Sequence, residues 1–68
     1  MNIFKGIEYM KIIAEPTSFA LHGGLERKTF RSINECALYF DRSESEIKSI
    51  IDNGNLIKGY YLDYKLEA

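Results

Sequence analysis

The chain has 68 residues, of which 46% are apolar, and its formal net charge is −1. This length allows one domain, residues 1–68, and the apolar content is too high for a disordered chain. A near-neutral chain does not belong to the strongly basic class of nucleic-acid-binding proteins, so any basic surface depends on where its lysines and arginines lie.

The N-terminal part of the sequence favours a short β-hairpin. Residues 9–14 are rich in strand-forming side chains, and Gly6 would weaken a helix that began earlier. We therefore expect a strand over residues 9–14, paired across residues 15–17 with a second strand over residues 18–22. Residues 29–31 form a third short extended piece. The alternative is a helix whose apolar face would consist of Ile3, Ile7, Met10 and Ala14.

Residues 32–54 carry the clearest local pattern. Two serines are each followed three positions later by a glutamate, which is the capping-box pattern of a helix start. The two pairs are Ser32–Glu35 and Ser43–Glu46. Asn53-Gly54 supplies a residue that tolerates the left-handed conformation found at helix ends. The sequence therefore predicts two short helices joined by a tight turn, a helix-turn-helix-like unit.

Such a unit needs a small apolar junction where the two helices cross. The residues expected to meet there are Ala37, Phe40, Ile47 and Ile50. The turn departs from the usual pattern, because Asp41 replaces a frequent glycine and Arg42 stands where an apolar residue is often buried.

The segment after Gly54 predicts a C-terminal strand over residues 56–64, with Tyr60, Leu62 and Tyr64 on one face. The expected fold is α+β: a small winged helix-turn-helix-like domain with a short N-terminal β-hairpin, two short helices and a C-terminal strand.

The chain offers little material for catalysis or metal binding. Cys36 is the only cysteine and His22 the only histidine, so we expect no internal disulfide, no metal site, no cofactor and no enzymatic activity. Cys36 lies on the apolar face of the first predicted helix. The apolar runs are too short to span a membrane and no signal peptide is expected, which favours a cytoplasmic protein. Because the core must be small, we also expect a partner or a homodimer.

Three segments resemble a known family. Residues 31–40 (RSINECALYF), 43–51 (SESEIKSII) and 54–61 (GNLIKGYY) are similar to the small helix-turn-helix repeats found beside intron-encoded homing nucleases. The shared pattern is serine-isoleucine-x-glutamate-alanine-alanine, a second helix led by serine, and then lysine-glycine-tyrosine. The resemblance covers about half the chain and implies binding of double-stranded DNA by the second helix. It also implies a phage or mobile-element origin and thus a host-cell cytoplasm.

On this interpretation the second helix enters the major groove and flanking cations contact phosphates. The residues expected to contact nucleic acid are Arg27, Lys28, Arg31, Arg42, Ser43, Ser45, Lys48, Ser49, Lys58 and Tyr60. Lys58 and Tyr60 belong to the expected wing.

The alternative is a phage-type protein that binds a host protein and inhibits or redirects it. Three acidic residues on the second helix and several tyrosines favour this reading, because tyrosine is enriched at protein interfaces. The residues expected at such an interface are Glu44, Glu46, Asp52, Tyr60, Tyr61 and Tyr64.

Overall fold

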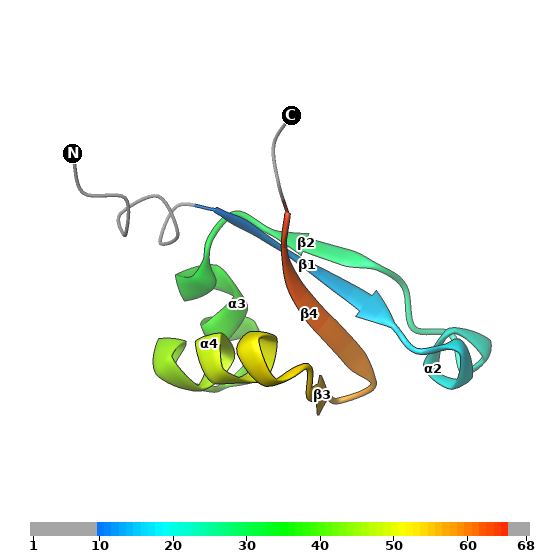
Figure 1. Ribbon diagram of the computed structural model, residues 1–68. Coiled ribbons are helices and arrows are strands. Elements are labelled where there is room, and N and C mark those ends of the chain that lie inside the picture. Colours follow the sequence, from blue (N-terminus) through cyan, green and yellow to red (C-terminus); the bar gives the residue numbers. More distant parts are fainter. Residues whose placement is uncertain (1–9, 66–68) are drawn as a thin grey trace.

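The computed structural model describes residues 10–65, which form a small α+β domain. The elements are, in order, β1 (Lys11–Pro16), α2 (Ser18–His22), β2 (Lys28–Phe30), α3 (Ile33–Phe40), α4 (Glu44–Asn53), β3 (Leu56–Ile57) and β4 (Tyr60–Lys65). The strands make one antiparallel sheet in the order β2-β1-β4-β3. Figure 1 shows α3 and α4 on one side of this sheet and α2 at its far end.

One face of the sheet and the inner faces of α3 and α4 enclose the core. The period-2 alternation of the strands sets Ile12 and Ala14 of β1 on the same face of the sheet as Tyr60 and Leu62 of β4, and all four are buried. The expectation that Tyr60, Leu62 and Tyr64 share a face is confirmed, since Tyr64 packs against the same cluster. The complete buried cluster is Ile12, Ala14, Phe30, Ile33, Cys36, Ala37, Phe40, Ile47, Ile57, Tyr60 and Leu62.

The N-terminal hairpin differs from the expected one. Residues 18–22 form the helix α2 rather than a strand, because the Thr17 side chain accepts a hydrogen bond from the Ala20 amide at 3.0 Å and so caps a helix start. The antiparallel partner of β1 is instead β2, with Ile12 opposite Phe30. The expected first strand is observed, although it runs to Pro16, and Tyr9 lies outside the described residues.

The C-terminal segment is a hairpin rather than a single strand. Ile57 pairs with Tyr60 across a two-residue turn formed by Lys58 and Gly59. Both turn residues have positive φ, 47° and 88°, as a type I′ hairpin turn requires. The longer strand β4 then runs beside β1, from Pro16 opposite Tyr60 to Lys11 opposite Lys65. This hairpin is therefore part of the main sheet.

Among residues 10–65, no helix has the length and the apolar character needed to cross a membrane.

Candidate nucleic-acid interface

Helices α3 and α4 pack through the junction expected from the sequence. Ala37, Phe40 and Ile47 are 4%, 1% and 0% exposed, and they belong to one apolar cluster. Ile50 is partly buried and packs against that cluster. Residues 32–54 therefore contain two helices, α3 and α4, that share one apolar core.

The two predicted capping boxes have different outcomes. At α4 both bonds form: the Ser43 hydroxyl oxygen accepts from the Glu46 amide at 3.1 Å, and the Glu46 carboxylate accepts from the Ser43 amide at 3.2 Å. At α3 the Ser32 hydroxyl oxygen accepts from the Glu35 amide at 3.3 Å. The Glu35 carboxylate, however, accepts from the amide of Arg31 rather than that of Ser32. The prediction of a complete capping box at α3 is wrong, because the glutamate bonds to the amide one residue before the serine.

The backbone geometry of the turn between α3 and α4 accommodates both residues that depart from the usual pattern, Asp41 and Arg42. Asp41 ends α3 in the left-handed conformation, with φ 56° and ψ 50°, which short polar side chains tolerate better than most. The Arg42 amide donates to the Ala37 carbonyl oxygen at 3.0 Å, and this bond closes the turn. The Arg42 side chain is exposed and lies 4.0 Å from the Glu46 carboxylate. The unit thus forms without an apolar residue at this position.

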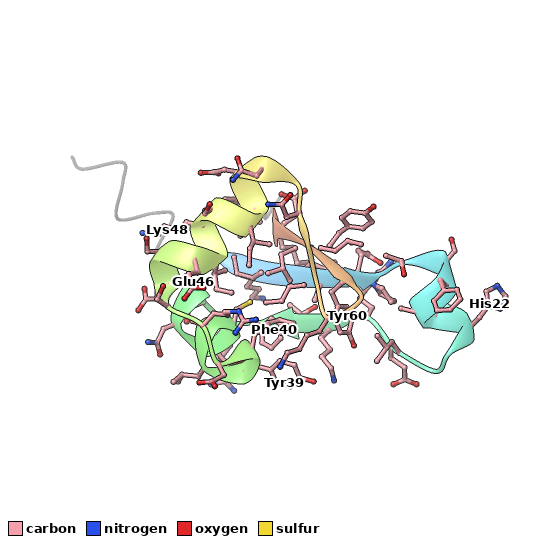
Figure 2. The ribbon with its side chains drawn as sticks, turned by 90° about the horizontal axis from the view of Figure 1, so that it is seen from below. His22, Tyr39, Phe40, Glu46, Lys48 and Tyr60 are labelled. Carbon is pink, nitrogen blue, oxygen red and sulfur yellow. The ribbon has the colours of Figure 1, made fainter. Side chains whose placement is uncertain are left out.

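The outward face of α4 holds the side chains expected to read DNA. Ser45 and Ser49 are exposed, and Lys48 is half-buried. Figure 2 shows Lys48 and Glu46 projecting from α4. Glu44, Glu46 and Asp52 set three carboxylates against the single ammonium of Lys48, so the side chains of this helix sum to −2.

The cations expected to contact phosphates fall into two groups. The Arg27 guanidinium lies 2.8 Å from the Glu15 carboxylate, and Arg42 lies near Glu46, so both face a carboxylate. Within residues 10–65 the other four have no such ion pair; they are Lys28, Arg31, Lys48 and Lys58. Of this second group, Lys28 and Lys58 line one pocket, whereas Lys48 lies on α4.

Tyr60 is a core residue rather than a wing contact. It is 3% exposed, and its hydroxyl donates to the Glu26 carbonyl oxygen at 3.0 Å. Its ring centroid lies 6.0 Å from that of Phe40. The prediction that Tyr60 contacts nucleic acid is therefore wrong, because β4 is an internal strand whose Tyr60 points into the core.

The residues of the expected protein interface do not gather on one surface. Tyr61 is 50% exposed and follows Tyr60 along the strand, so it lies on the opposite face of the sheet. Tyr64 is partly buried on the inner face, where burial, followed by the charges of Asp52 and Asp63, raises the pKa of its hydroxyl. The acidic residues lie on α4, so they do not share a surface with Tyr61.

A shallow pocket with a volume of about 360 Å³ opens beside α3. Its lining comes from four separate segments and consists of Gly24, Leu25, Glu26, Lys28, Tyr39, Phe40, Lys58 and Tyr60. Figure 2 shows Tyr39, Phe40 and Tyr60 grouped between α3 and β4, well away from His22 on α2. The sequence pattern held no sign of this pocket, because its walls meet only through tertiary contacts.

Cys36 and His22 occupy the places that their sequence neighbours imply. Cys36 is fully buried in the core, and burial raises the pKa of its thiol to about 11. His22 is the exposed last residue of α2. No group of three or more histidine, cysteine, aspartate or glutamate side chains within residues 10–65 could hold a metal ion.

No family model, no curated protein and no solved structure matches this chain. The resemblance of residues 31–61 to helix-turn-helix repeats therefore stays a prediction.

Proposed function

We propose that this chain is a small DNA-binding module of the winged helix-turn-helix kind. The observation that carries the proposal is the packing of α3 against α4 through Ala37, Phe40 and Ile47, with the β3–β4 hairpin directly after α4. In proteins with this arrangement the second helix enters the major groove, and its N-terminal residues contact base edges.

In the proposed complex, Ser45, Lys48 and Ser49 face the base edges. Serine hydroxyls can donate or accept a hydrogen bond, and lysine donates to guanine acceptors. Arg31, Lys28 and Lys58 contact backbone phosphates, since none of them makes an ion pair with a carboxylate within residues 10–65.

The charge of α4 sets the expected strength of binding. The carboxylates of α4 repel phosphates. In addition, Glu46 pairs with Arg42 and Glu15 of β1 pairs with Arg27, so these two arginines are less available to phosphates. Few phosphate contacts remain, so the proposed binding is weak, and its affinity falls with salt less steeply than that of a strongly basic DNA-binding protein.

The test is the affinity of the chain for mixed-sequence DNA duplexes, measured by fluorescence anisotropy at several salt concentrations. Lys48→Glu should weaken binding about tenfold at low salt. Lys65→Glu, which changes the net charge equally at an exposed position on β4, should weaken it much less. Negligible binding of the natural chain at low salt would contradict the proposal, and equal losses in both variants would move the contact away from α4.

A second candidate is a protein-binding module, and a specific observation favours it. Among residues 10–65, six large hydrophobic side chains are at least half exposed, namely Phe19, Leu21, Leu38, Tyr39, Leu56 and Tyr61. Together with the acidic α4 they suit a partner whose surface is basic and apolar. Co-purification of one host protein with the tagged chain would support this candidate, and a clean pull-down from lysate would count against it.

A further inference from the structure

The shallow pocket beside α3 is lined by two lysines. Lys28 enters it from β2, and Lys58 enters it from the β3–β4 turn. Glu26 supplies one carboxylate to the same lining, so the charged side chains of the pocket sum to +1. This contrasts with the sum of −2 on α4, so an anion is better accommodated in the pocket than beside the helix.

Within residues 10–65, Lys28 makes no ion pair with a carboxylate and contacts an aromatic ring instead. Its ammonium nitrogen lies 5.2 Å from the centroid of the Tyr39 ring. That ring is itself fixed, because its centroid lies 5.2 Å from that of Phe30 and 4.9 Å from that of Phe40. An aromatic ring positions an ammonium group but leaves its charge unneutralised. Lys28 is therefore placed in advance for an anion.

Lys58 stands on a turn that is anchored to the rest of the pocket wall. The Thr17 amide donates to the Gly59 carbonyl oxygen at 3.0 Å. A Cβ at Gly59 would lie 3.0 Å from a methyl group of Leu25, so the turn packs tightly against the loop after α2. On the other side, the Tyr60 hydroxyl ties that loop to β4 through the Glu26 carbonyl oxygen. These contacts form the pocket before any ligand arrives.

We propose that this pocket is a phosphate-binding site in which Lys28 and Lys58 donate to the phosphate oxygens. In the DNA complex it holds one backbone phosphate of the strand that runs past the β3–β4 turn; this second part rests on the proposed function. Lysine binds phosphate as a compact charge, and a preformed site avoids the entropy of ordering its side chains on binding. Glu26 lowers the affinity because its carboxylate faces the same anion.

The first experiment uses inorganic phosphate and does not depend on DNA. Phosphate is added to the isotope-labelled chain while amide and lysine signals are followed by NMR, with chloride at equal ionic strength as the control. Saturable shifts at Lys28, Tyr39 and Lys58 that chloride does not produce would support the site. Shifts spread over all exposed lysines, or equal shifts with chloride, would overturn it.

Three variants test the assignment of charge. Lys28→Met keeps an aliphatic stem over Tyr39, and Lys58→Asn suits the positive φ of the turn, so both should fold. Each should weaken phosphate binding about tenfold or more, the loss expected for a charge-assisted hydrogen bond. Glu26→Gln should strengthen it, since only the backbone carbonyl of Glu26 makes a structural bond. Unchanged affinity in both lysine variants would overturn the proposal.

A parallel titration with DNA separates the site from the proposed function. If the natural chain binds DNA and Lys58→Asn lowers both the affinity and the salt dependence, relative to Lys65→Asn, the pocket holds a backbone phosphate. If DNA binding is unchanged in Lys58→Asn, the pocket assignment fails while the proposed function stands. If phosphate binds in the pocket and DNA does not bind at all, the proposed function fails while the site stands.

Discussion

The α3–α4 unit and helix α2 both begin at a hydroxyl cap, yet different interactions hold them in place. The unit buries Phe40, which is 1% exposed, whereas α2 buries no residue and its Phe19 is 90% exposed. The position of α2 depends instead on its cap, on the hydrogen bond from Thr17 to Gly59, and on the close approach of Ala20 to that glycine. A helix of five residues can therefore be positioned by its ends and its neighbours, without a buried face of its own.

Removing the two phenylalanines should give the largest difference between these regions. Phe40→Ala should lower the free energy of unfolding by about 3–5 kcal/mol, because it leaves a cavity in the core. Phe19→Ala should change it by less than about 0.5 kcal/mol, as expected for an exposed side chain. Urea denaturation of both variants measures the two values. A large loss in Phe19→Ala would show that this side chain is packed in solution, as in the homodimer expected from the small core.

Two glycines on either side of β3 provide the next comparison: one follows α4, and the other lies in the β3–β4 turn. Gly54, after α4, has φ 68° and open space where a Cβ would lie, whereas Gly59 has φ 88° and a Cβ there would meet Leu25 at 3.0 Å. Gly54→Ala should cost about 1–2 kcal/mol from backbone strain alone. Gly59→Ala should cost roughly 1 kcal/mol more, because Leu25 and Ala20 must also shift. Thermal and urea unfolding measure both losses of stability. If Gly54→Ala and Gly59→Ala lose equal stability, α2 is not packed against this turn.

The two hydroxyl caps should differ in their effect on stability. Ser43→Ala removes the acceptor for the Glu46 amide and should destabilise the whole domain by about 1 kcal/mol. Thr17→Ala removes the equivalent bond in α2, where a local opening leaves the core intact, so its effect on global unfolding should be smaller. Hydrogen exchange of the Ala20 amide should instead become faster in Thr17→Ala. A greater loss of global stability in Thr17→Ala than in Ser43→Ala would contradict this comparison.

The buried thiol of Cys36 should report unfolding of the α3–α4 unit. Its raised pKa, about 11, keeps it protonated at neutral and mildly alkaline pH, and thiolate is the reactive form. Its rate of labelling by a thiol reagent should be low in the native protein and should rise together with the population of unfolded chain in urea. A Cys36→Ser, Ser45→Cys variant carries an exposed thiol on α4 and should react at once. Equally fast labelling of native Cys36 would show that α3 opens without global unfolding.

The sequence predicts elements whose signals are local. The serine-glutamate spacing and the apolar stripe identified α3, α4 and their shared core, because capping and helix packing depend on neighbours within a few positions. The expectation of a strand over residues 18–22 is wrong, because the neighbouring residues do not show that the helix starting after Thr17 is supported by Gly59, 42 positions away from Thr17. The candidate nucleic-acid interface likewise depends on contacts between distant segments, which local patterns do not show.

Single cations such as Lys48 and Lys58 can be proposed from the sequence, whereas their partners cannot. The pairing of Arg27 with Glu15, the burial of Tyr60 and the pocket around Lys28 all depend on how β1, β2 and β4 are aligned. The register of these strands depends on contacts between segments that are far apart in the sequence. Local patterns in the sequence therefore do not reveal it.

The position of β1 between β2 and β4 has a consequence for how the chain folds. Its register pairs Lys11 with Lys65, so this inner strand gains its longer partner only when the last described residues of the chain pair with it. Such a pairing has a high contact order, and the entropy of closing so long a loop must be overcome before the pairing stabilises the fold. We therefore expect the α3–α4 hairpin to form early and β4 to join β1 in the rate-limiting step, so that shortening β4 itself would slow folding more than its lost contacts suggest.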